Sequence, residues 1–337
     1  MWAIQDVRNV SGSLERFLID RGETVVRLAP QLMAGARRGA RTRGKSDPID
    51  ALAIARTALR EGVENLPTAR LAGPEREIRQ LALYRERLLD MRTRLSNELR
   101  WQLHELWPDW EIPAKAFAQP VWRTRITNRL ARAEQTTQIL LARDMIRRTR
   151  ELTRATKDLY DKITVLVKQV APQLLAEPGI GVLLAATFIG EIAGIDRFTT
   201  DAQLARLAGC APIPVSSGRS DRYRLDPGGN RRLNSAFYML AIIRISHDPR
   251  TAVYLAKQRA NGKTKREAIR SLKRHLVRRV YTLMRTPSSA PTTVCLTMPA
   301  GGAQTSASSG SLARSLLAHA APRVRGPRLA RPQSRNR

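Results

Sequence analysis

Residues 75–107 read EREIRQLALYRERLLDMRTRLSNELRWQLHELW, and leucines recur in this stretch every seven residues, at Leu81, Leu88 and Leu95. Such spacing predicts one long helix with a single apolar seam. A second series with the same spacing follows, with Ile163 and Val170 at companion positions: Met145, Leu152, Leu159 and Leu166. The fold is therefore predicted to be mixed but mostly α, with a long helical, coiled-coil stalk at residues 75–173.

The two predicted stalk helices have two ways to cover their seams. They either pack on each other as an antiparallel pair within one chain, or form a dimerising coiled coil that brings two nucleic-acid-binding units together. The spacing leaves both arrangements open. Arginines on the outward faces are either solvated surface or phosphate contacts.

The segments on either side of the stalk have different patterns. Residues 1–65 read as part of an α/β unit: an apolar start, a helical pattern with Leu14, Phe17 and Leu18, a strand at Thr24–Leu28, and a helix from Asp47. Residues 174–285 predict a compact, mostly helical C-terminal domain. The segment 286–337 contains no Asp, Glu or Lys and shows no periodicity, so we predict a disordered basic tail.

The charge of the chain narrows the classes of partner. The 337 residues include 59 Lys and Arg against 29 Asp and Glu, a net charge of +30, of which the 286–337 tail supplies only seven. An excess of this size predicts a polyanionic partner, with nucleic acid as the leading candidate.

The most apolar run, Val182–Ile195, is short and interrupted by Glu191, which predicts a buried helix and no membrane span. Cys210 and Cys295 are too far apart for a metal-binding motif or a disulfide framework, which fits a cytoplasmic location.

Asp47 and Asp50 stand three residues apart at a predicted helix start. Both carboxylates can reach one side of the first turn, where a divalent cation such as Mg²⁺ would relieve their repulsion and polarise a phosphate. The alternative is purely structural, with Asp47 as the N-cap, Pro48 at the first helical position and Asp50 beside the positive end of the helix dipole.

Glu177-Pro178-Gly179-Ile180-Gly181 precedes the apolar helix and resembles the turn of a helix-hairpin-helix. Gly179 and Gly181 would let the backbone approach a phosphate, which the first N–H groups of the next helix can bind. An ordinary glycine turn between packed helices is the alternative.

The densest group of chemically useful residues lies at 211–232. Ser216, Ser217 and Gly218 are followed by five arginines, Arg219, Arg222, Arg224, Arg231 and Arg232. Serine attack on a phosphodiester builds negative charge on oxygens that arginines stabilise. No histidine is near in the sequence, so a hydrolase triad is not indicated. The alternative is a phosphate-binding loop. Residues 257–279 add an amphipathic helix, in which Lys273 is assigned to the basic face.

Three stretches taken in order resemble the IS110 family of insertion-sequence transposases, DNA recombinases of the DEDD type. They are GKSDPIDALAIAR at residues 44–56, PGIG at 178–181, and APIP at 211–214 followed by SG at 217–218 and GGNR at 228–231. Together the resemblance extends over residues 1–285.

This resemblance implies a fold and a mechanism. Residues 1–65 would be part of a RuvC-like, RNase H-like domain whose acidic cluster holds Mg²⁺, with Asp47 and Asp50 as its last two acids. Ser217 would attack DNA and form a phosphoserine linkage, and Ser216 is the weaker candidate. Family members act on DNA, use a structured guide RNA from their own element, and work as oligomers, so a homo-oligomer is expected here.

The sequence departs from the family pattern at two places that bear on activity. The strand carrying the first acid would lie before Met1, and the second acid aligns with Gln5, which is a poorer ligand for a hard cation. We therefore expect an N-terminally truncated or decayed element with impaired activity, and a tail that a shifted reading frame could produce. The rival functions are a non-catalytic nucleic-acid-binding protein and a magnesium-dependent nuclease working through Asp47 and Asp50.

Overall fold

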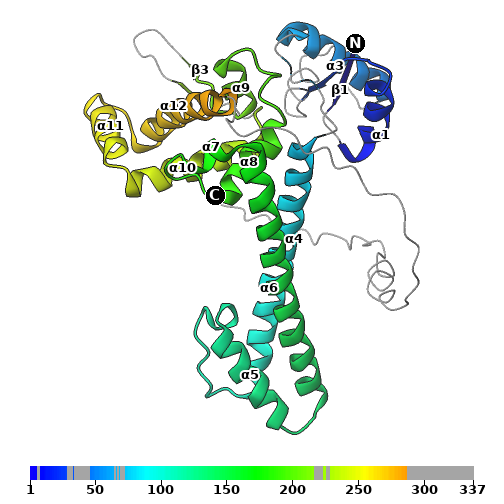
Figure 1. Ribbon diagram of the computed structural model, residues 1–337, viewed down its shortest axis with the longest axis vertical. Coiled ribbons are helices and arrows are strands. Elements are labelled where there is room, and N and C mark those ends of the chain that lie inside the picture. The colour runs from blue at the N-terminus through cyan, green and yellow to red at the C-terminus, as the bar shows by residue number, and fades with distance from the viewer. Residues whose placement is uncertain are drawn as a thin grey trace, which may run out of the picture. The chain divides into compact units, whose positions relative to one another are not determined.

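The computed structural model describes residues 1–5, 8–28, 33, 46–63, 66, 68, 73–215, 223–224 and 228–286. This part of the chain is mostly helical, as predicted, with two small sheets (Figure 1). Its main elements are β1 (Trp2–Gln5), α1 (Arg8–Ile19), β2 (Val25–Leu28), α3 (Asp47–Glu61), α4 (Pro74–Leu106), η2 (Ala116–Ala118), α5 (Pro120–Arg132), α6 (Thr137–Val170), α7 (Pro172–Leu175), α8 (Val182–Ile192), α9 (Asp201–Leu207), β3 (Ile213–Pro214), β4 (Tyr223–Arg224), α10 (Arg231–His247), α11 (Pro249–Ala260) and α12 (Lys265–Arg285). None of the described helices is long and apolar enough to cross a membrane. The tail predicted to be disordered lies outside the described residues beyond Thr286.

The N-terminal segment forms a βαβ unit. Strands β1 and β2 are parallel, with Trp2 opposite Val25 and Gln5 opposite Leu28, and α1 makes the crossover. The predicted strand is confirmed as β2, and α3 packs against this sheet around a small apolar core. Of the predicted helix face only Leu18 is buried, whereas Leu14 and Phe17 stay about half exposed.

The stalk consists of α4 and α6 lying side by side (Figure 1). One end of α4 shares a core with the C-terminal end of α6, through Ile78 and Ile163. Its other end packs with the N-terminal end of α6 and with α5, through Leu99, Ile126 and Ile146. The two helices are therefore antiparallel, and the pairing found is the one within a single chain.

The apolar seam of α6 is centred on the row predicted as its companion, the one that contains Ile163. Four buried residues spaced by seven belong to this row: Ala142, Thr149, Thr156 and Ile163. Ile146 and Val167 are buried next to it. The predicted row, Met145 to Leu166, is half-buried beside it. Heptad spacing indicated both rows, and only the packing against α4 decides which of them is more deeply buried.

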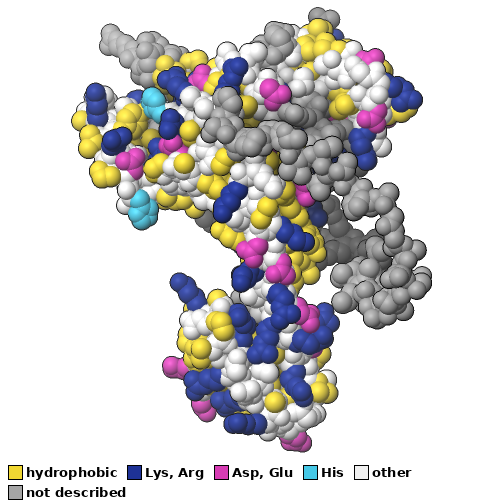
Figure 2. Space-filling model, in the orientation of Figure 1, with side chains coloured by type: hydrophobic (Ala, Val, Ile, Leu, Met, Phe, Trp, Pro, Cys, Tyr) yellow, Lys and Arg dark blue, Asp and Glu magenta, His cyan; other side chains and the backbone are white. Residues whose placement is uncertain are grey.

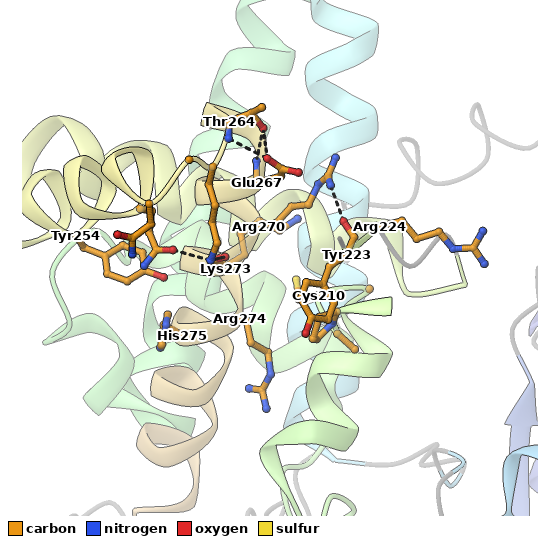
Figure 3. Close-up of a pocket in the computed structure, with 18 residues that line it drawn as sticks. Cys210, Tyr223, Arg224, Tyr254, Thr264, Glu267, Arg270, Lys273, Arg274 and His275 are labelled. Atoms are coloured by element: carbon orange, nitrogen blue, oxygen red, sulfur yellow. Dashed lines mark hydrogen bonds between the residues drawn. The ribbon is translucent and has the colours of Figure 1, made fainter. Parts of the chain in front are cut away.

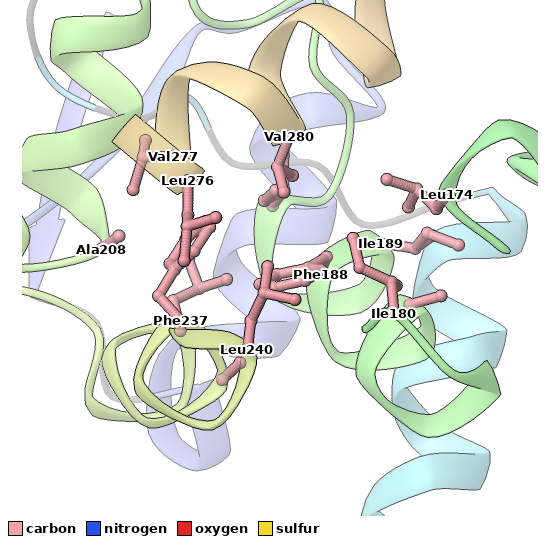
Figure 4. Packing of buried hydrophobic residues seen from close by; sticks show 14 of the residues in the cluster. Leu174, Ile180, Phe188, Ile189, Ala208, Phe237, Leu240, Leu276, Val277 and Val280 are labelled. Atoms are coloured by element: carbon pink, nitrogen blue, oxygen red, sulfur yellow. The ribbon is translucent and has the colours of Figure 1, made fainter. Parts of the chain in front are cut away.

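The largest core lies where α8 meets α4, α10 and α12 (Figure 4). Phe188 of α8 and Phe237 of α10 stack with ring centroids 4.7 Å apart. Helix α8 is buried as predicted, and Glu191 within it accepts hydrogen bonds from Arg79 Nε (2.9 Å) and Asn230 Nδ2 (2.8 Å). These bonds compensate for burying a carboxylate and tie α8 to α4 and to the start of α10.

Candidate functional site

The predicted nucleophile belongs to the connection of a short hairpin. Strands β3 and β4 pair antiparallel, with Ile213 opposite Arg224 and Pro214 opposite Tyr223. The residues between them include Ser216, Ser217, Arg219 and Arg222, all of which lie outside the described residues. The predictions on these four residues therefore remain predictions, while the two strands fix where the connection leaves and re-enters the domain.

A pocket of about 680 Å³ lies at the base of this hairpin (Figure 3). The described ends of the hairpin, the turn after α9, the end of α11 and the first turns of α12 line it. Six of its lining side chains carry or can carry a positive charge: Arg224, Lys263, Arg270, Lys273, Arg274 and His275. The fold brings these residues together from β4, from the loop before α12 and from α12 itself. The surface that they form suits an anionic group.

The prediction that Lys273 belongs to the exposed basic face of α12 is wrong. Its side chain is only 4% exposed, and its ammonium donates a hydrogen bond to Asn234 Oδ1 of α10 at 2.7 Å. Asn234 in turn donates to the carbonyls of Ala208 and Gly209. Burial lowers the pKa of Lys273, so this amine loses its proton more readily than a surface lysine does.

His275 is a second pocket residue that the sequence did not identify. It lies against Tyr254 with ring centroids 5.3 Å apart. Burial and the neighbouring cations Arg278, Arg274 and Lys263 lower its pKa, which favours the neutral ring at pH 7. No sequence signal links His275 to the serines, because 58 positions separate it from Ser217 and only the fold brings α12 to the hairpin.

Not every cation beside the pocket is available to a ligand. Arg274 donates to Asp201 Oδ2 of α9 at 2.6 Å. Arg270 donates to the carbonyl of Tyr223 at 3.2 Å, which anchors β4 to α12. Arg224 is exposed at the mouth of the hairpin and is the predicted DNA-contacting arginine that the structure places against the pocket.

The GGNR motif at 228–231 builds the start of α10. Asn230 is the N-cap and accepts hydrogen bonds from the backbone N–H groups of Arg232 and Leu233. Gly229 packs so closely that a Cβ would lie 2.2 Å from the backbone nitrogen of Gly209, so only glycine fits. Arg231 is exposed, whereas Arg232 pairs with Glu86 of α4 and with Glu191.

The predicted phosphate-binding turn is fixed by ion pairs. Glu177 is buried and pairs with Arg244 of α10 and Arg279 of α12. Gly179 has φ +86° and packs against Leu240. Both the backbone conformation and the close packing therefore favour glycine at this position, without any bound phosphate. Gly181 is the exposed N-cap of α8, and a Cβ there would meet nothing within 4 Å. The backbone at the start of α8 is therefore accessible, although the four-residue α7 is shorter than the first helix of the predicted motif.

Asp47 and Asp50 lie in the first turn of α3 with Pro48 between them. The N-cap is Ser46, not Asp47 as the structural alternative predicted, because Ser46 is the last residue with extended backbone (φ −149°, ψ 160°). Asp47 is exposed and Asp50 half-buried. Two such carboxylates suit a magnesium ion as a pair of ligands. Among the described side chains no three His, Cys, Asp or Glu gather to hold a metal, so the pair alone does not complete a site.

Two family models match this chain. One, described as a transposase and built on DEDD-type IS110 proteins, matches residues 1–108. The other, described as the transposase IS116/IS110/IS902 family, matches residues 171–256. The matches cover the βαβ unit with α3 and α4, and the segment from α7 into α11.

Curated relatives come from three insertion elements. The chain is 36% identical over 117 residues to the uncharacterized 43.6 kDa protein of IS110 from Streptomyces coelicolor, covering 34% of this chain and 29% of that protein. It is 33% identical over 114 residues to the 42 kDa protein of IS900 from Mycobacterium paratuberculosis, covering 33% and 29%. Both matches thus span less than a third of the relative. The 44.8 kDa protein of IS116 from Streptomyces clavuligerus is 27% identical over 333 residues, covering 84% and 82%.

Proposed function

Because the chain belongs to the IS110 family of insertion-sequence transposases, we propose that it cuts and rejoins DNA strands with Ser217 as the nucleophile. The observation that carries this proposal is the cationic pocket at the base of the β3–β4 hairpin. Ser217 follows Pro214, the last residue of β3, by three positions in the sequence. This short spacing supports the assignment of the attacking hydroxyl and of the cations that suit a phosphodiester to one site.

In the proposed reaction the Ser217 oxygen attacks a phosphorus atom of DNA. An O–P bond forms, the bond from phosphorus to the oxygen of one strand breaks, and that oxygen takes up a proton; attack by a second strand on the phosphoserine reverses these changes. Arg219, Arg222 and Arg224 would stabilise the charge on the phosphoryl oxygens. Lys273, with its lowered pKa, is the pocket amine suited to accept the serine proton.

Asp47 and Asp50 are the residues of this chain that would hold Mg²⁺. The ion, when bound, would polarise a phosphate and orient it. Gln5, at the end of β1, stands at the position of a further acid in the family pattern and offers only a neutral carboxamide. Because Gln5 replaces a carboxylate, we infer that this chain binds Mg²⁺ more weakly. The serine reaction proposed above is described without assigning a position to the ion.

The proposed domains follow the same assignment. Residues 1–65 form part of a RuvC-like, RNase H-like domain, residues 75–173 the stalk, and residues 174–285 the C-terminal transposase domain. The turn at Gly179 and Gly181 would bind a DNA or RNA backbone in the manner of a helix-hairpin-helix. Arg231 and Arg232, at the start of α10, would add further phosphate contacts. The partners are DNA, a structured guide RNA from the same element, and further copies of this chain.

The decisive experiment traps the protein–DNA linkage. The full chain is incubated with labelled DNA carrying the ends of its element and with RNA transcribed from that element, then denatured and separated on a gel. We expect a covalent adduct that Ser217→Ala abolishes and that the matched variant Ser216→Ala retains. Gln5→Glu should raise its yield by restoring a carboxylate.

Two results would contradict the proposal in distinguishable ways. Strand cleavage that needs Asp47 and Asp50, releases hydrolysis products and forms no adduct indicates a magnesium nuclease. DNA binding without either product, and indifferent to Ser217→Ala, indicates a non-catalytic binding protein. The net charge of +30 is compatible with each, so only the chemistry of the products separates them.

A further inference from the structure

The far end of the stalk carries a pocket that the proposed strand-transfer chemistry does not use. Its volume is about 670 Å³, and it lies between the end of α4, the loop that follows and α5. Its wall consists of two tryptophans, three arginines and four smaller side chains: Trp107, Trp110, Arg125, Arg129, Arg132, Val121, Thr124, Asn128 and Ala133. An indole wall with a guanidinium rim differs from the pocket at the hairpin, in which no tryptophan takes part.

Planar side chains lie against one another at this pocket. The indoles of Trp107 and Trp110 meet edge to face with centroids 5.5 Å apart. The guanidinium carbon of Arg129 lies 4.5 Å from the first ring centroid and 4.4 Å from the second. A third indole, Trp122, has Arg125 at 5.0 Å. Such cation–π layers present planar faces on which another planar group can stack.

The surroundings of the pocket are strongly basic. Residues 92–154 contain 13 Lys and Arg against 7 Asp and Glu, and Lys and Arg side chains gather over this end of the stalk in Figure 2. Burial and the nearby cations Arg150 and Arg92 lower the pKa of Arg123, which shows like charges held close together. Asp144, one of the few acids, is already paired with Arg147 and Arg148. A polyanion would relieve this repulsion.

The fold of the stalk tip does not require the exposed members of the pocket. Its core is made by apolar residues of α4, α5 and α6, such as Leu103, Ile126 and Leu130, which are fully buried. Arg125, Asn128 and Arg129 are exposed on the opposite face of α5. These exposed side chains are therefore free to contact a ligand without loss of the core.

We propose that this pocket binds an unpaired nucleotide, with its base stacked on the Arg129–tryptophan layer and its phosphates on the surrounding arginines. A base inside a duplex has both faces covered by its neighbours and cannot enter, so the ligand is a single strand, from DNA or from RNA. The assignment is independent of Ser217 and of the proposed reaction.

The test measures binding of the full chain to fluorescent oligomers of deoxythymidine and of uridine, and to a DNA duplex of equal length. Arg129→Ala is expected to weaken binding of at least one single strand about tenfold, the range found for loss of one stacking contact. Arg129→Lys keeps the charge but not the planar fork, so it should also weaken that strand by several-fold. Arg87→Ala, an exposed arginine in the middle of α4, is the matched control and should change binding less than twofold.

The pattern across the ligands decides the outcome. A loss for Arg129→Ala and Arg129→Lys that is confined to single strands supports the nucleotide pocket, and the strand that binds more tightly identifies DNA or RNA as its source. An equal loss on the duplex, or full rescue by Arg129→Lys, would reduce Arg129 to a phosphate contact and overturn the proposal. So would losses no larger than that of Arg87→Ala. Because Arg129 is exposed, an unchanged thermal midpoint is expected for both variants.

Discussion

Glu177 holds the turn between α7 and α8 to two other helices. Its carboxylate accepts a hydrogen bond from Arg279 Nε at 2.9 Å and pairs with Arg244, which also donates to the carbonyl of Pro178 at 3.2 Å. Glu177→Gln leaves both guanidiniums without their counter-charge. We expect it to lower the free energy of unfolding at pH 7 by about 1–3 kcal/mol, below the value for a fully buried pair because Arg279 is half exposed.

The pH dependence of this effect has a definite sign. Burial would raise the pKa of Glu177, but the hydrogen bonds from Arg279 and Arg244 outweigh it, and the pKa lies below its usual range. The carboxylate therefore stabilises the fold above its unfolded pKa of about 4.3 and loses that contribution as the pH falls through the folded pKa. Urea unfolding should show a difference between wild type and Glu177→Gln that shrinks from pH 7 to about pH 3. Glu151→Gln, which breaks an exposed pair with Arg147, is the control and should stay within about 0.5 kcal/mol.

Single residues were predictable where the local sequence determines their environment. Asp47 and Asp50 were expected at a helix start and lie there, and the predicted N-cap differs from the observed one by a single position. The prediction that Lys273 is exposed was wrong, because whether a lysine on an amphipathic helix is buried depends on its packing partner. That partner is Asn234 of a different helix. His275 could not be identified, since its place beside the hairpin is set by tertiary contacts. The role of Ser217 stays a prediction.

At the scale of the helices, a buried hydroxyl in the stalk offers a test of stability. Thr149 of α6 is fully buried, and its hydroxyl has no hydrogen-bond partner within the described part of the protein. Burying a hydroxyl without a partner costs about 1–3 kcal/mol. Thr149→Val keeps the branched shape and removes the hydroxyl, so it should raise the free energy of unfolding by about 1 kcal/mol.

A matched substitution one heptad along the same helix gives the control. The hydroxyl of Thr156 is also buried but donates to the carbonyl of Thr153 at 2.9 Å. Thr156→Val removes that bond, so it should leave stability unchanged or lower it by up to about 1 kcal/mol. In thermal or urea unfolding, Thr149→Val should therefore raise the stability and Thr156→Val should not. A gain for Thr156→Val equal to that for Thr149→Val would show that the gain comes from added apolar surface alone.

Elements with a strong internal period were easier to predict than their neighbours. The heptads of α4 and α6 and the apolar run of α8 indicated long or buried helices, and these are found. The two-residue strands β3 and β4 have no period of their own, and their pairing depends on the closure of the hairpin. The burial of Thr149 and Thr156 in the seam was likewise unpredictable, because polar residues at heptad positions are assigned to the surface unless the facing helix is known.

For the molecule as a whole, positive charge is the dominant property. Residues 1–285 carry 52 Lys and Arg against 29 Asp and Glu, so most of the excess belongs to the part with helices and strands. Several of these cations are paired with buried acids, as Arg244 and Arg279 are with Glu177. Many others lie on exposed faces of α5, α6 and α12. Charge of this extent disfavours the compact state unless a polyanion compensates for it.

Binding to DNA of arbitrary sequence should accordingly be strongly salt-dependent. If about six phosphates are neutralised, the affinity is expected to fall about a thousandfold between 50 and 200 mM salt, because each contact releases a counterion. A variant ending at Thr286 removes seven arginines and no acids, and it should keep a steep slope since the remaining net charge is still +23. The measurement is the dissociation constant of a labelled duplex at several salt concentrations. A slope that vanishes in the shortened variant would place the phosphate contacts in the tail, and a flat slope in the full chain would contradict a phosphate-binding surface altogether.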